Sequence, residues 1–173
     1  MKEELLAEAR QLSESTEWKT ARARLIELQA EWKEIGPAPR KRNQKLWNDF
    51  RAACDIFFNR SKEFYEEMDQ ERANNLNQKL DICLHMELLA KVVLDTSEIP
   101  YDPNVPMAEQ LNIALEYKDE IVVPGDSRTT LQKASNKFRV LQERWKAIGP
   151  VPKKDDKELW ERYRKASKIC SGF

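Results

Sequence analysis

The sequence predicts an all-α fold in which two tandem three-helix units are joined by a long shared helix, giving an elongated molecule. Three observations predict it. One motif occurs twice along the 173 residues. No glycine or proline interrupts residues 40–99, where good helix formers such as Glu, Lys, Leu and Ala dominate. Charged residues make up 35% of the chain and apolar residues 40%, with only four glycines, a composition typical of long, thin helical proteins.

The repeated motif lies in residues 28–56 and 141–169, which align without a gap 113 residues apart. About half of the aligned positions are identical. The shared positions include Trp32 and Trp145, Gly36 and Gly149, Pro37 and Pro150, Pro39 and Pro152, Trp47 and Trp160, and Arg51 and Arg164. Two such copies in one chain indicate a structural repeat.

Each copy reads as a helix that ends at a Gly-Pro turn. Before the glycine, apolar residues recur at steps of three and four, which predicts one apolar helical face. These residues are Ala21, Leu25, Leu28, Trp32 and Ile35 in the first copy, and Ala134, Phe138, Leu141, Trp145 and Ile148 in the second. We expect Gly36 and Gly149 to end the two helices in the left-handed conformation that glycine adopts easily, before Pro37 and Pro150 prevent continuation.

The helix after each turn needs an N-cap, and the sequence offers alternatives. Asn43 and Asp156 occupy equivalent positions and are candidate caps. Asp155 is another candidate, because Glu158 follows three residues later as in a capping box.

The helix of the first copy is expected to run from Asn43 to about Val93, or ~75 Å at 1.5 Å per residue. Residues 69–75 in its middle carry almost no apolar side chains, so we interpret them as an exposed bridge.

Residues 2–12 weakly resemble residues 79–89, which lie 77 positions further along the chain. This resemblance predicts a first unit over 1–72 and a second over 73–173. The second unit has an insert at about 94–126, with a proline-rich loop, a short helix over 107–121 and a Pro-Gly turn.

The two motifs resemble a bacterial family known as domain of unknown function 349. Its signature combines a tryptophan at a helix end, an Ile-Gly turn with prolines, and a Leu-Trp-x-x-Phe-Arg helix start, found here in residues 32–51 and 145–164. The resemblance implies a helical fold in tandem copies and a bacterial origin, and it supplies no activity, cofactor or catalytic residue. Because the second copy ends at Phe173, we expect its last helix to be truncated, as in a fragment of a longer array.

Catalytic, metal and cofactor sites are not indicated. The chain has one histidine, His85, and three widely spaced cysteines, which we interpret as buried hydrophobic residues of a reducing compartment. Glycine-rich phosphate loops, nucleophile elbows, membrane-length apolar runs and a secretory signal are all missing from the sequence. We therefore expect a cytoplasmic protein that is not an enzyme, with no cofactor and no membrane contact.

Basic residues gather at the two linkers. Arg40, Lys41 and Arg42 follow the first turn, Lys153 and Lys154 follow the second, and Arg51 and Arg164 lie two turns into the following helices. A basic loop at a helix N-terminus is a candidate site for phosphate or another anion, including nucleic acid. The alternative is solvated charge with ordinary ion pairs. Asp155 and Asp156 also reduce the net positive charge of the second linker.

We expect the four motif tryptophans to pack in the turn and the core of each unit.

The sequence thus favours a non-enzymatic helical repeat module that binds or scaffolds another protein, through side chains of the insert or of the exposed long helix. Nucleic-acid binding through the basic linkers is the alternative. The balance of 30 basic against 30 acidic residues gives no overall attraction to nucleic acid, and self-association stays open.

Overall fold

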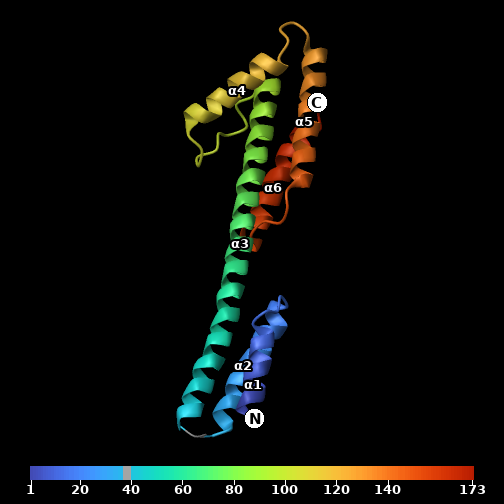
Figure 1. The fold of residues 1–173 in the computed structure, drawn as a ribbon. Helices are drawn as coiled ribbons and strands as arrows, with labels where there is room; N and C mark the ends of the chain where they lie inside the picture. The colour runs from blue at the N-terminus through green and yellow to red at the C-terminus, as the bar shows by residue number, and fades with distance from the viewer. Residues whose placement is uncertain (37–39) are drawn as a thin grey trace. The chain divides into compact units, whose positions relative to one another are not determined.

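The computed structural model describes residues 1–36 and 40–173, apart from the side chain of Arg40. The described residues form six α-helices and no strand (Figure 1), which confirms the all-α prediction. They are α1 (Lys2–Leu12), α2 (Trp18–Glu34), α3 (Arg40–Leu94), α4 (Met107–Ile121), α5 (Ser127–Ala147) and α6 (Lys153–Cys170). None of the helices in this part of the chain is both long and apolar enough to cross a membrane.

The chain divides into two compact units, Met1–Met68 and Asp69–Phe173. The predicted uninterrupted helix is α3, which spans 55 residues and contributes its first part to unit 1 and its second part to unit 2.

Unit 1 packs α1, α2 and the first part of α3 around one hydrophobic core. Its buried residues follow the three-and-four spacing of each helix, which places them on single faces: Leu5, Leu6, Ala9, Ala21, Leu25, Leu28, Trp32, Phe50, Ala53, Cys54 and Phe57. Arg60 on α3 donates a hydrogen bond to the carbonyl oxygen of Ser13 and lies over the ring of Trp18. This side chain ties the α1–α2 turn to α3.

Unit 2 repeats the same arrangement with the second part of α3, α5 and α6. With the exception of Cys54, positions that form the buried core of unit 1 are buried again 77 residues later for α1 and 113 residues later for α2 and α3: Ile82, Cys83, Met86, Ala134, Phe138, Leu141, Trp145, Tyr163, Ala166 and Cys170. Leu159 is buried as well, although its counterpart Leu46 is only partly buried. Residues 79–89 of α3 therefore take the place in unit 2 that α1 takes in unit 1.

All three cysteines are free and buried, and burial raises the pKa of the Cys83 and Cys170 thiols to about 12.

The two Gly-Pro turns differ from the prediction that both use a left-handed glycine. Gly36 has φ +79° as expected, whereas Pro37 and Pro39 lie outside the described residues. Gly149 does not have a positive φ, because α5 ends at Ala147 and Ile148 is already extended. A Cβ at Gly149 would lie 3.1 Å from the Asn75 amide nitrogen, so this glycine permits close approach to α3 rather than a helix cap.

The N-termini of α3 and α6 also differ from the predicted caps. α6 begins at Lys153 after Pro152, so Asp155 and Asp156 lie in the first helical turn, where their charge favours the helix dipole. Asn43 lies inside α3 and accepts a hydrogen bond from Lys2 Nζ at 2.6 Å.

The insert is fastened to unit 2 by polar contacts. α4 covers the residues for which a short helix is predicted, and it buries Gln110, Tyr117 and Ile121. The Gln110 amide accepts from Asp102 N–H at 2.9 Å and donates to the carbonyl oxygens of Asp102 and Val105. Arg162 of α6 bonds Glu87 of α3 at 2.5 Å and lies 3.0 Å from the Asp102 carboxylate, which links three segments through one guanidinium.

Candidate interaction surfaces

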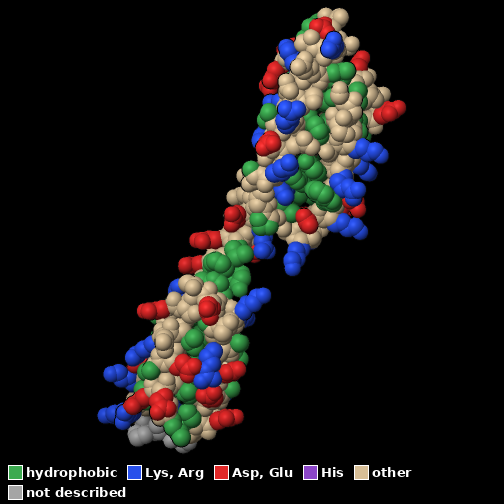
Figure 2. Space-filling model, turned by 90° about the vertical axis from the view of Figure 1, so that its right-hand side faces the viewer, with side chains coloured by type: hydrophobic (Ala, Val, Ile, Leu, Met, Phe, Trp, Pro, Cys, Tyr) green, Lys and Arg blue, Asp and Glu red, His purple; other side chains and the backbone are tan. Residues whose placement is uncertain are grey.

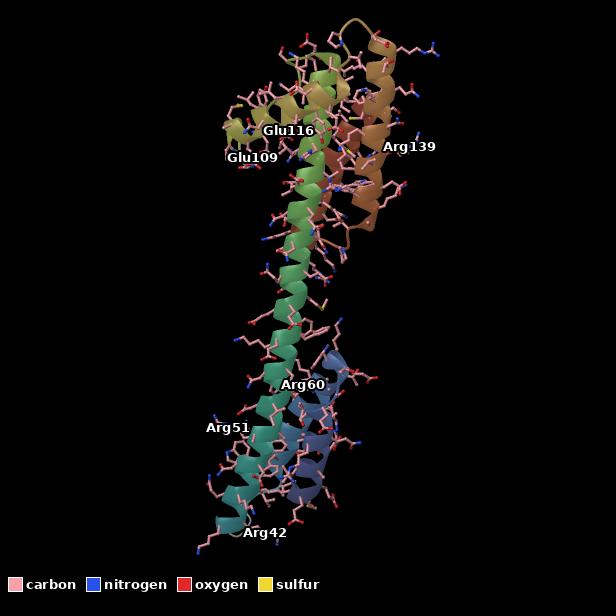
Figure 3. The ribbon with its side chains drawn as sticks, turned by 45° about the horizontal axis from the view of Figure 1, so that its top comes forward. Arg42, Arg51, Arg60, Glu109, Glu116 and Arg139 are labelled. Atoms are coloured by element: carbon pink, nitrogen blue, oxygen red, sulfur yellow. The ribbon has the colours of Figure 1, made fainter. Side chains whose placement is uncertain are left out.

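The basic linkers of the two units carry their charge differently. In unit 1, Lys41 is exposed and Arg42 pairs with Glu3 of α1. The side chain of Arg40 lies outside the described part of the chain. Arg51 is exposed and points away from α1 and α2 (Figure 3). Part of the predicted cationic set is therefore neutralised within unit 1.

In unit 2, Lys153 and Lys154 are exposed in the first turn of α6, beside Asp155 and Asp156. Arg164 lies eleven residues further along α6, roughly 16 Å away at 1.5 Å per residue. The structure therefore separates Arg164 from the linker lysines. Nucleic-acid binding through the linkers stays a prediction.

The four motif tryptophans are not equivalent. Trp32 and Trp145 are buried, and each stacks on an aromatic ring of the next helix, Phe50 at 4.5 Å and Tyr163 at 3.9 Å. Trp47 is half-buried against the core of unit 1. Trp160 leaves 49% of its surface exposed, which differs from the expectation that all four tryptophans pack in the turn and the core of each unit.

Trp160 lines a groove of about 650 Å³ on the surface of unit 2. The groove runs along α6 and reaches Gln142 of α5. Its other lining residues are Glu161, Tyr163, Arg164, Lys165, Ser167, Lys168 and Ser171. Arg164 thus shares a groove with an exposed aromatic ring and two lysines, and not with the linker.

The second surface is the outer face of α4. Met107, Leu111 and Leu115 recur every four residues and form a row that we call the α4 stripe. The three side chains are 43–57% exposed, although Gln110, Tyr117 and Ile121 on a neighbouring face of the same helix are buried. α4 also carries four carboxylates, Glu109, Glu116, Asp119 and Glu120, against the single cation Lys118 (Figure 3 labels the first two). At 3.6 residues per turn, most of these carboxylates lie on the side of α4 away from the stripe, whereas Lys118 lies in line with it.

The single histidine helps to hold α4 in place. His85 Nδ1 of α3 lies 2.5 Å from the Tyr117 hydroxyl oxygen of α4, and the two groups share a hydrogen bond. Burial lowers the pKa of His85 and raises the pKa of Tyr117, so both side chains are neutral at pH 7. Within the described residues, no group of three or more His, Cys, Asp or Glu side chains is arranged to hold a metal ion.

The family of the chain is established by three matching segments. Residues 1–41, 45–99 and 107–154, which together make up well over half of the chain, match the family described as Domain of Unknown Function (DUF349). The chain belongs to this family. The resemblance drawn from the two tryptophan motifs is confirmed, and so is the occurrence of the DUF349 domain more than once. No curated protein and no solved structure matches the chain.

For this DUF349 protein, reasoning from sequence predicted binding through the insert and included Arg164 among the candidate cations. It did not identify the α4 stripe or the α6 groove, although signals for both exist. α4 has apolar residues on two faces, with Ile113, Tyr117 and Ile121 on one and the α4 stripe on the other. A helix that is apolar on two sides has to contact two partners. In α6, Lys165 and Lys168 replace Ala52 and Asp55 of the first copy, a gain of positive charge that the aligned motifs make visible.

Proposed function

We propose that this chain is a non-catalytic helical module that binds another protein through the α4 stripe. The observation that carries the proposal is the α4 stripe itself. Three large apolar side chains, Met107, Leu111 and Leu115, are exposed on a helix that is already packed on its own unit through a neighbouring face. Because each of them is already about half covered, burying the rest would contribute about half of the ~1.5–3 kcal/mol expected for complete burial of such a side chain.

The net charge of α4 favours a basic partner. Four carboxylates and one lysine give the exposed part of α4 a net negative charge. Two copies of α4 carry the same net negative charge, which disfavours self-pairing through this helix. An amphipathic helix fits the α4 stripe through its apolar face, and flanking Lys or Arg residues would complement the net negative charge of α4.

The way in which α4 is attached supports a binding role. Gln110, the His85–Tyr117 hydrogen bond and Arg162 hold the helix and the loop before it by polar contacts to fixed partners. A surface held in its binding conformation loses little conformational entropy when a partner docks. We also propose that the module works in the cytoplasm, which the three free cysteines support.

The proposal is tested with two synthetic amphipathic helical peptides that share one apolar face and carry either Lys or Glu at the flanking positions. We expect the basic peptide to bind at least about tenfold more tightly than the acidic one, because several surface ion pairs of about 0.2–1 kcal/mol each add to the apolar contact. Isothermal titration calorimetry measures both affinities.

The variant Leu111→Glu/Leu115→Glu should remove this binding. The matched control is Ile26→Glu/Ile56→Glu, which places the same two charges on apolar side chains of unit 1 that are 51% and 52% exposed. The proposal fails if the acidic peptide binds as well as the basic one, or if the control weakens binding as much as the α4 variant does.

A further inference from the structure

The groove along α6 combines an exposed aromatic ring with unpaired positive charge. On the face of unit 2 formed by α5 and α6, Figure 2 shows hydrophobic side chains bordered by Lys and Arg side chains. Arg164, Lys165 and Lys168 line the groove together with one carboxylate, Glu161. Among the described residues, none of these three cations takes part in an ion pair. Their charge therefore remains available to a ligand.

Trp160 is the outer member of a row of stacked rings. Trp145 and Tyr163 stack at 3.9 Å with 16° between their planes, and Tyr163 and Trp160 follow at 5.6 Å and 23°. Lys79 lies over the Trp145 ring at 4.7 Å, at the buried part of the row. Stacking on Tyr163 fixes the Trp160 ring, so about half of a rigid aromatic surface is presented to the groove.

Unit 1 shows that the repeat fold does not require this groove. The positions equivalent to Trp160, Arg164, Lys165 and Lys168 are Trp47, Arg51, Ala52 and Asp55. Trp47 is half-buried against its core, and Arg51 and Asp55 balance each other in charge. The exposed ring and the excess positive charge occur together in the second copy, where folding alone does not explain them.

We propose that the α6 groove binds single-stranded nucleic acid. A base stacks on Trp160, and the phosphates that follow it along the strand lie against Arg164, Lys165 and Lys168. Gln142, Ser167 and Ser171 offer hydrogen bonds to base edges or sugars. From Trp160 to Ser171 the groove extends roughly 16 Å along α6, enough for a site at the short end of the ~4–16 nucleotides that single-strand-binding surfaces cover.

An acidic peptide would satisfy the three cations but not the ring. Indole and nucleobase surfaces are flat and stack on each other, and each such contact is sequence-tolerant because every base has a π-face. A rigid exposed ring beside unpaired cations therefore favours a strand of nucleotides over a chain of carboxylates. This inference concerns a different surface from the α4 stripe and does not depend on it.

The test uses the whole chain and a fluorescein-labelled 12-nucleotide oligoadenylate, with fluorescence anisotropy as the readout. We expect binding at low salt that weakens steeply as salt increases, because phosphate contacts release counterions. Trp160→Ala should lower the affinity by about 5- to 150-fold, the range that corresponds to ~1–3 kcal/mol for one stacked base, and Trp160→Phe should retain most of the affinity. Arg164→Glu/Lys168→Glu should abolish binding.

Three controls separate the alternatives. Arg51→Glu reverses the equivalent charge in unit 1 and should leave the affinity unchanged, as should Leu111→Glu/Leu115→Glu on α4. Inorganic polyphosphate and an oligoglutamate peptide, which carry charge without bases, should compete only weakly. Absence of binding at low salt, equal affinity of the wild type and Trp160→Ala, or competition by oligoglutamate as strong as that by unlabelled oligoadenylate would overturn the proposal.

Discussion

Lys2 and Lys79 illustrate how single residues define the repeat. Lys2 Nζ lies 5.3 Å from the centre of the Trp32 ring in unit 1, and Lys79 Nζ lies 4.7 Å from the centre of the Trp145 ring in unit 2. The two lysines are 77 positions apart, the spacing at which residues 2–12 weakly resemble residues 79–89. Sequence similarity in that segment is low because apolar residues of different shape fill the same places, whereas the cation over the tryptophan is kept.

His85 is the residue for which a pH dependence is expected. The pKa of His85 is lowered in the folded state, mainly by burial, even though Asp81 and Glu116 nearby oppose the effect and Arg144 and Lys137 reinforce it. The unfolded chain then takes up a proton at a higher pH than the folded one. The free energy of unfolding should therefore decrease as pH falls below about 6.5, the usual pKa of histidine.

Urea unfolding at pH values from 7.5 to 5.5 measures this decrease. The chain has a single histidine, so His85→Gln should make the stability nearly independent of pH in that range. An unchanged pH dependence in His85→Gln would show that other groups cause it.

At the scale of the helices, spacing and breakers predict the elements well. The apolar steps of three and four, the uninterrupted residues 40–99 and the prolines of the insert correspond to α2, α3, α4 and α5. Helix ends were less predictable. Pro152 precedes α6 at the position where a side-chain cap was expected. α5 ends without a left-handed glycine, because Gly149 instead allows close contact with Asn75. Where a helix ends depends on its tertiary contacts, which the residue pattern of a single helix does not show.

α4 depends on Gln110 for its attachment. Gln110 is fully buried, and its amide bonds both the N–H and the carbonyl oxygen of Asp102. Gln110→Ala would leave these backbone groups without their partner, so we expect a loss of about 1–3 kcal/mol in the free energy of unfolding.

Hydrogen exchange of the backbone amides locates the effect of Gln110→Ala. Exchange should increase in residues 100–121 and stay unchanged in α1 and α2. Equal protection of residues 100–121 in the variant and the wild type would contradict the role assigned to Gln110.

At the scale of the whole molecule, the chain contains two copies of one three-helix unit, and the second copy carries an insert. Both candidate surfaces belong to unit 2, as the α4 stripe comes from the insert and the α6 groove from substitutions in the second motif. The sequence could predict the repeat because its core positions share residue types. It could not predict which residues form the two surfaces, because exposure of Trp160 or Leu111 depends on what the neighbouring helices leave uncovered.

The central claim is that the α4 stripe binds a basic amphipathic helix of another protein. Site-specific photo-cross-linking in cells tests it most directly, with a photoreactive phenylalanine analogue at position 111 and, as control, at position 26. The account predicts a cross-linked protein at position 111 only, with the attached peptide in a helical segment rich in Lys and Arg. Equal cross-linking at both positions, or attachment to acidic or extended segments, would contradict it.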